Sequence, residues 1–83
     1  MAKRTSEEDR ELKEYLKKLG ERIKTLRKEK GYANYEVFSY ERNLSRSQVG
    51  RYEAGTEDLQ FSSLLKVIRA LDMTVGEFFS EGF

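Results

Sequence analysis

The segment from Asn43 to Gly55 most restricts the fold of this chain, because it encodes both the start and the end of one short helix. Ser45 is a favourable N-cap for the free amides of a first turn, and Gln48 stands three positions later, where its side chain can complete a capping box. Gly55 suits the left-handed residue that ends a helix. The sequence therefore predicts a short helix with a fixed orientation and one polar face.

A helical projection divides this segment into two faces. Val49 and Tyr52 fall on the inner face. The outer face carries arginine, hydroxyl and small residues, which suit a DNA major groove because Arg can donate two hydrogen bonds to guanine and Gly permits close approach. The alternative is an ordinary solvated face of a small helical domain, and this helix alone does not separate the two interpretations.

Composition limits the class of protein. A chain of 83 residues has room for one domain, and its apolar share of 37% equals its charged share, so the core must be small. The sequence contains no proline and no strand-like alternation, and we expect an all-α fold. It also contains no cysteine and no histidine, which argues against an enzyme, a metal site or a cofactor.

The first half of the chain predicts one long helix. Apolar residues recur at spacings of three and four from Leu12 to Leu26, and Gly31 is placed to end the helix near residue 30. Ser6 is a possible N-cap, and Gly20 marks either a bend or a close helix contact. Part of the apolar stripe lies beyond the reach of a small core, so it either folds back on the later helices or packs against a second copy as a possible dimer surface. These residues are Leu12, Tyr15 and Leu16.

The second half predicts four shorter helices. Asn34 can cap a helix over 35–42, and with the helix after Ser45 this gives a helix-turn-helix over about 34–53. A fourth helix is expected to begin at Ser62 or Ser63, after Phe61 as an inward anchor. Thr74 can begin a fifth helix with a capping box. The expected organisation is an extension of the first helix over 1–18, a domain over 19–80 and a tail over 81–83.

Charge is unevenly distributed along the chain. The net charge is only +1, but residues 10–30 hold nine Lys or Arg against four Glu, and residues 53–83 hold two against six Asp or Glu. A basic front and an acidic back can orient a small domain on a polyanion, although solvated helix faces carry such charges as well.

Taken together, these segments resemble the lambda-repressor-like, or XRE-type, helix-turn-helix family over about residues 19–79. The resemblance lies in LGERIKTLRKEKG for the first helix, LSRSQVGRYEAG for the recognition helix and LLKVIRALDMTVGEFF for the two closing helices. It implies a five-helix DNA-binding domain whose recognition helix lies in the major groove. The chain departs from the family pattern at Arg42, a position that is usually apolar, where the stem could lie on the core and the head could reach a phosphate.

The resemblance also implies which residues contact DNA. The base contacts map to Arg46, Ser47, Gln48, Gly50 and Arg51. The Gln48 side chain could serve either the helix cap or a base contact. The phosphate contacts map to Asn34, Tyr35, Arg42 and Thr56.

An internal ion pair is implied as well, between Arg27 on the first helix and Glu53 on the recognition helix. In the family, such a pair is partly buried and fixes one helix against the other. The alternative is two unrelated surface charges, worth at most about 1 kcal/mol.

The expected function is sequence-specific binding to double-stranded DNA by a small bacterial or phage-type transcriptional regulator that acts through operator occupancy. One such domain has a small footprint, so we expect a homodimer on half-sites about 10 bp apart. A protein-interaction module on the same fold, such as an antitoxin or an anti-repressor partner, is the alternative. The polar start and the lack of an apolar run near 20 residues predict a cytoplasmic protein, associated with the nucleoid when bound to DNA, with no membrane or small-molecule partner.

Overall fold

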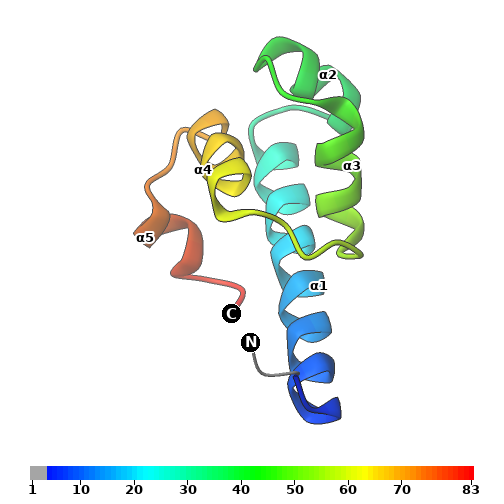
Figure 1. The fold of residues 1–83 in the computed structure, drawn as a ribbon. Coiled ribbons are helices and arrows are strands. Elements are labelled where there is room, and N and C mark those ends of the chain that lie inside the picture. The colour runs from blue at the N-terminus through cyan, green and yellow to red at the C-terminus, as the bar shows by residue number, and fades with distance from the viewer. Residues whose placement is uncertain (1–3) are drawn as a thin grey trace.

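The computed structural model describes residues 4–83, which form five α-helices and no strand (Figure 1). The prediction of an all-α chain is confirmed. Residues 1–3 of the expected N-terminal extension lie outside the described part. Within residues 4–83, no helix has the length and apolar character needed to cross a membrane. The helices are α1 Ser6–Glu29, α2 Tyr35–Glu41, α3 Arg46–Ala54, α4 Phe61–Ala70 and α5 Val75–Phe79.

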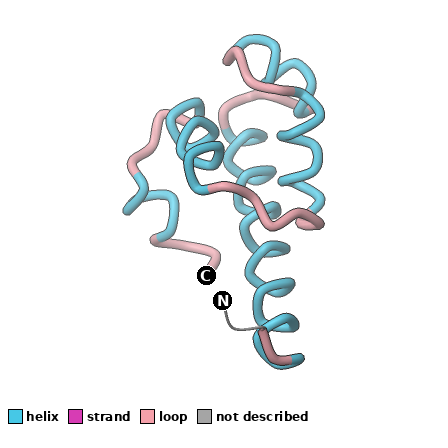
Figure 2. Tube along the Cα trace, in the orientation of Figure 1, coloured by secondary structure: helices cyan, strands magenta, loops and turns pink. Residues whose placement is uncertain are grey.

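The long helix α1 is the element on which the others are arranged. Figure 1 shows α3 alongside the middle of α1, with α4 and α5 on the other side. The N-terminal turns of α1 extend beyond this bundle, and the described residues span 39 × 25 × 20 Å. Figure 2 shows that short loops join α1 to α2 and α2 to α3, while a longer loop leads from α3 to α4.

The core is small and is built mainly by the inner faces of α1, α3 and α4. Phe38 and Phe78, both fully buried, come from the short helices α2 and α5 and close the core. Tyr52 is buried at 2% exposure, as expected for the inner face of α3. The buried apolar residues are Leu19, Ile23, Phe38, Val49, Tyr52, Leu64, Val67, Ile68, Ala70, Leu71 and Phe78.

Most of the predicted helix ends are confirmed, because they depend on local chemistry. The Asn34 side chain accepts a hydrogen bond from the amide of Val37 at 2.9 Å, and Ser45 accepts one from the amide of Gln48 at 3.4 Å. Gly55 ends α3 at φ 71°, in the left-handed region. At α5, Thr74 forms the predicted capping box with the residue three positions later.

Three details of the predicted ends are wrong. The N-cap of α1 is Thr5 rather than Ser6, because Thr5 has the extended backbone of a cap and forms a complete capping box. Gln48 gives only its amide to the cap of α3, so no capping box forms there. Helix α4 begins at Phe61 without a side-chain cap, and Phe61 is 56% exposed rather than an inward anchor, because the first turn faces solvent.

Gly20 is the point where α3 lies closest to α1. A Cβ atom built on Gly20 would lie 2.5 Å from the carbonyl oxygens of both Tyr52 and Glu53. Real Cβ atoms do not approach backbone so closely, so only glycine permits this crossing. Of the two roles expected for Gly20, close helix contact is therefore the one observed. The consequence is that the backbone of α3 rests directly on α1.

Candidate nucleic-acid interface

A buried ion pair joins α3 to α1. Arg27 donates from Nε to one Glu53 carboxylate oxygen at 2.8 Å and from Nη2 to the other at 2.9 Å, and it donates from Nη1 to the Tyr32 carbonyl at 2.7 Å. The two side chains are only 3% and 8% exposed. Parallel hydrogen bonds of this kind fix the direction as well as the distance between charged groups. Together with the crossing at Gly20, the pair sets the rotation of α3, and it makes the structural pair expected from the sequence.

The opposite face of α3 is polar and exposed. The Arg46 and Arg51 side chains are 71% and 51% exposed, and Ser47 is exposed beside them. Gln48 is half-buried, and its side chain is left out of the helix cap. Three of the five predicted base-contact residues are therefore exposed on this face, and Gln48 is partly covered by the rest of the chain.

The fifth of these residues, Gly50, is partly covered. A Cβ atom at Gly50 would lie 3.0 and 3.1 Å from two ring carbons of Tyr35 and 3.3 Å from its hydroxyl oxygen, so this side chain rests against α3 at this point. The absence of a side chain at Gly50 thus first serves the contact between α2 and α3. Tyr35 is half-buried and packs on the core edge through this contact, beside the predicted base-contact residues.

Both exposed arginines have a carboxylate partner within the chain. Arg46 lies 3.5 Å from Glu36 of α2, and Arg51 Nε donates a short hydrogen bond to Glu57 in the loop after α3. The two carboxylate side chains are 56% and 38% exposed. Ion pairs this exposed contribute about 0.2–1 kcal/mol, so they orient the guanidinium groups without making them inaccessible. Sequence reasoning did not identify these partners.

The predicted phosphate-contact residues differ in availability. Asn34 is exposed but uses its side-chain oxygen to cap α2, and Thr56 is exposed just after the end of α3. Arg42 is engaged elsewhere: it donates to the Tyr32 hydroxyl at 3.3 Å, and its Nη2 lies 3.4 Å from Asp72. Hence the structure brings Asn34 and Thr56 to the open surface, while the head of Arg42 is already bound within the chain.

Asp72 is the centre of a small cluster of charged side chains that lies apart from α3. Lys30 Nζ lies 2.8 Å from the Asp72 carboxylate and, together with Arg42, lowers the pKa of that group. The hydrogen bond to the Tyr32 hydroxyl in turn raises the pKa of the Arg42 guanidinium. This cluster links the end of α1 and the end of α2 to the turn before α5, which gives Arg42 a structural role.

Two lysines of α1 extend the candidate interface beyond the residues identified from the sequence. Lys24 and Lys28 are exposed and line a hollow of about 350 Å³ with Asn34 and Gly50. Neither lysine has an ion-pair partner within residues 4–83. Their basic character was visible in the sequence, but a helix end explains such residues equally well. Only the packing of α2 and α3 on α1 places these two lysines beside α3.

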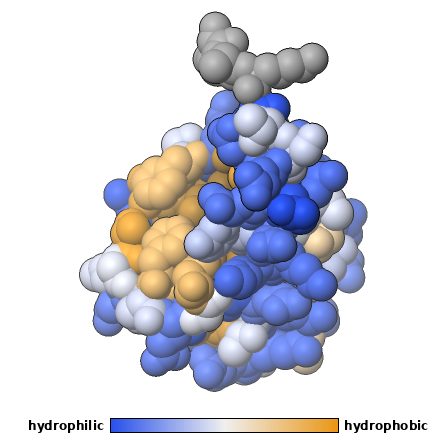
Figure 3. Space-filling model, turned by 90° about the horizontal axis from the view of Figure 1, so that it is seen from below, coloured by the Kyte–Doolittle hydropathy of each residue, from blue (hydrophilic) through white to orange (hydrophobic). Residues whose placement is uncertain are grey.

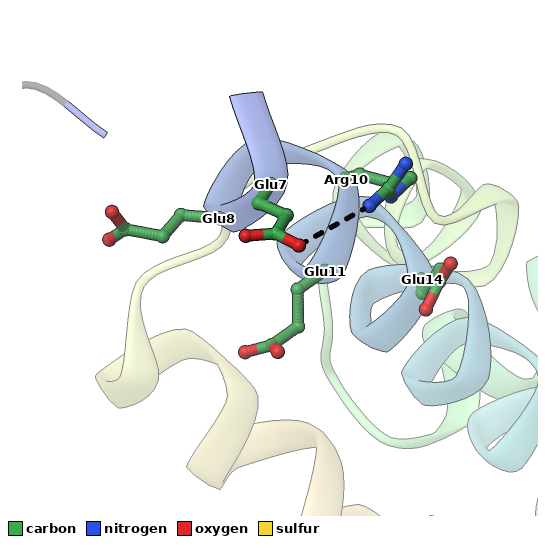
Figure 4. A pocket seen from close by; sticks show the side chains of 5 residues that line it. All are labelled: Glu7, Glu8, Arg10, Glu11 and Glu14. Atoms are coloured by element: carbon green, nitrogen blue, oxygen red, sulfur yellow. Dashed lines mark ion pairs between the residues drawn. The ribbon is translucent and has the colours of Figure 1, made fainter. Parts of the chain in front are cut away.

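The N-terminal turns of α1 carry a different surface. Figure 4 shows a shallow acidic region here, where Glu7 and Arg10 form an exposed ion pair at 3.9 Å. In the described part of the chain, no group of three or more acidic, His or Cys side chains is arranged to hold a metal ion. The possible dimer residues lie on this part of α1, with Leu12 and Leu16 half-buried and Tyr15 at 48% exposure.

Comparisons with protein-family models, curated proteins and solved structures return no match to this chain.

Proposed function

We propose that this protein binds double-stranded DNA in a sequence-specific manner, as a small transcriptional regulator of the lambda-repressor-like type that acts through operator occupancy. One observation carries the proposal. Helix α3 is fixed from its inner side by a buried ion pair and a direct backbone contact, while its outer side presents exposed Arg46, Ser47 and Arg51. A rigid helix with an exposed cationic face suits a major groove.

The energies of the competing contacts favour this function. Releasing Arg46 from Glu36, or Arg51 from Glu57, costs about 0.2–1 kcal/mol for each pair, because both pairs are exposed. A bidentate contact from Arg to guanine contributes about 1–3 kcal/mol of base discrimination. DNA can therefore replace the internal carboxylates as the partner of both arginines. At the correct base, the free energy of the contact with guanine exceeds the cost of breaking the internal ion pair.

Phosphate contacts would set the position of α3 on the duplex. Lys24 and Lys28 supply two unpaired charges beside α3, and Thr56 lies just after the C-terminal end of this helix. Contacts of this kind carry affinity and register but little sequence information. We expect each lysine that neutralises a phosphate to contribute about 0.9 to the slope of log affinity against log salt concentration.

The first experiment is selection from a random duplex pool at two salt concentrations, followed by titration of the recovered sequence. We expect a pseudo-palindromic motif and an affinity that falls steeply with salt. Arg51→Ala should relax the preference at one base position, while Lys28→Ala should weaken all duplexes equally. Lys13→Ala, which removes the same charge from the remote end of α1, is the matched control. Recovery of no motif and no binding at low salt would refute the proposal.

A protein-interaction module remains the second candidate, because one apolar groove of the domain lies open beside α1. Charge reversal distinguishes the two. Arg46→Glu with Arg51→Glu should abolish DNA binding and leave an interaction through the groove unchanged.

A further inference from the structure

An apolar groove of about 390 Å³ runs between α1 and the C-terminal part of the chain. Tyr15 and Leu16 form its α1 side, Phe79 and Phe83 form the opposite side, and Leu64 lies between them. Figure 3 shows that most of the apolar surface on this face of the molecule gathers on one side, beside a broad hydrophilic area. Large contiguous apolar patches on small proteins are typical of interaction sites.

The aromatic residues of the groove are incompletely covered by their own chain. Tyr15, Phe79 and Phe83 are 48%, 37% and 39% exposed. Phe79 and Phe83 contact each other at 5.0 Å between ring centroids, so the C-terminal residues shape this side of the groove. Burying such rings contributes strongly to association.

The charges beside Tyr15 identify the partner. Glu11 lies four residues before Tyr15 and Lys18 lies three residues after it, so all three project from the same side of α1. Both charged residues are exposed, and neither has an ion-pair partner within residues 4–83. Figure 4 shows Glu11 projecting from α1 at the shallow acidic region that Glu14 also lines. Lys18 Nζ lies 5.3 Å from the centroid of the Tyr15 ring.

We propose that a second copy of this chain occupies the groove, with the two α1 helices antiparallel across a twofold axis near Tyr15. An interface of this type is self-complementary, since each residue meets its counterpart in reverse order. Tyr15 then meets the partner's Tyr15, and Glu11 of each copy meets Lys18 of the other. The apolar groove supplies the contact area, and the reversed charges fix the direction of the helices.

The free position of α3 is compatible with this dimer. Figure 1 shows α3 and α5 on opposite sides of α1, so a partner in the groove leaves the outer face of α3 uncovered. The inference deepens the proposed function, because the dimer would carry two recognition helices, but it rests on the groove and its charges and is measured without DNA.

Sedimentation equilibrium on the whole chain at about 0.1 M salt tests the dimer. We expect wild type to associate, and Lys18→Glu or Glu11→Lys to weaken association on the order of 30-fold, because each change reverses two ion pairs per dimer. The double variant restores both pairs and should recover the dimer. An equimolar mixture of the two single variants should form a heterodimer. Lys13→Glu makes the same charge change on the opposite side of α1 and should have no effect.

Each other outcome overturns a definite part of the inference. A wild-type chain that stays monomeric at several hundred micromolar refutes the dimer. Equal effects of Lys18→Glu and Lys13→Glu, or a double variant that stays monomeric, refute the antiparallel arrangement. Thermal melts of every variant separate loss of association from loss of folding, and the exposed positions of Glu11 and Lys18 favour intact folding. A wild-type dimer that ignores every duplex leaves this inference standing and refutes the proposed function.

Discussion

Replacing Glu53 by Ala should destabilise the fold strongly, because the change leaves a buried guanidinium without its carboxylate. Arg27 is 3% exposed and has three hydrogen bonds, of which two go to Glu53 and one goes to the Tyr32 carbonyl. Breaking a buried ion pair by removing one partner costs about 3–5 kcal/mol. We expect the lower end, about 3 kcal/mol, because the bond to Tyr32 remains.

The size of this loss can be read from thermal unfolding. For a domain of this length, about 1 kcal/mol shifts the Tm by about 4–8 °C, so Glu53→Ala should lower the Tm by about 12–24 °C. A typical domain of 83 residues has about 4–12 kcal/mol of total stability, so the variant should be folded at low temperature but close to its limit. Circular dichroism melts at neutral pH measure the Tm and show whether the variant is folded at low temperature.

Two further variants separate the buried pair from an ordinary surface pair. Glu57→Ala removes the partner of Arg51, which is exposed, and should cost at most about 1 kcal/mol. The double change Arg27→Met with Glu53→Leu removes both buried charges and should be more stable than Glu53→Ala alone. If Glu53→Ala and Glu57→Ala melt within about 2 °C of each other, the reasoning about the buried charge is wrong.

Three further predictions concern packing, the recognition face and pH. Gly20→Ala should lower the Tm, because the added Cβ would lie 2.5 Å from two backbone carbonyl oxygens of α3. This clash should outweigh the better helix propensity of Ala, which is about 1 kcal/mol. Gly76→Ala in α5 is the control and should not lower the Tm, because its Cβ would meet nothing closer than 4.0 Å. Glu57→Gln should raise the affinity for all duplexes by up to about 5-fold, because the carboxylate no longer repels phosphate. It should also reduce the ratio of specific to random-sequence affinity, because the carboxylate no longer orients Arg51. Fluorescence anisotropy measures both affinities, and unchanged affinity would contradict this role of Glu57. The lowered pKa of Asp72 means that its ionised form stabilises the fold above the ordinary carboxyl pKa of about 4, and that this stability is lost as the pH falls from there through the lower folded-state value. The Tm of wild type should therefore fall more between pH 5 and 3, measured by circular dichroism, than that of Asp72→Asn, which also tolerates the φ of 59° at this position; parallel curves would count against the cluster.

Local chemistry made the helices predictable from the sequence. The caps at Asn34, Ser45 and Thr74 and the left-handed residue at Gly55 depend on groups within a few positions of each other, and all four are observed. One error occurred where two neighbouring residues could both serve as the N-cap, namely Thr5 and Ser6 at the start of α1. The exposure of Arg46, Ser47 and Arg51 was predictable for the same reason, since the periodicity of one short helix decides which side faces outward.

Long-range contacts decided the surroundings of α3 in the folded chain. The pairing of Arg27 with Glu53 was expected only from a family resemblance. The placement of Lys24 and Lys28 beside α3 was not predicted. The sequence determined five helices and their polar and apolar faces, because caps and periodicity act within one or two turns. The tertiary structure alone decided which faces meet, which charges are neutralised and where Tyr15 and Phe79 leave an open groove, because these depend on atoms brought together from distant parts of the chain.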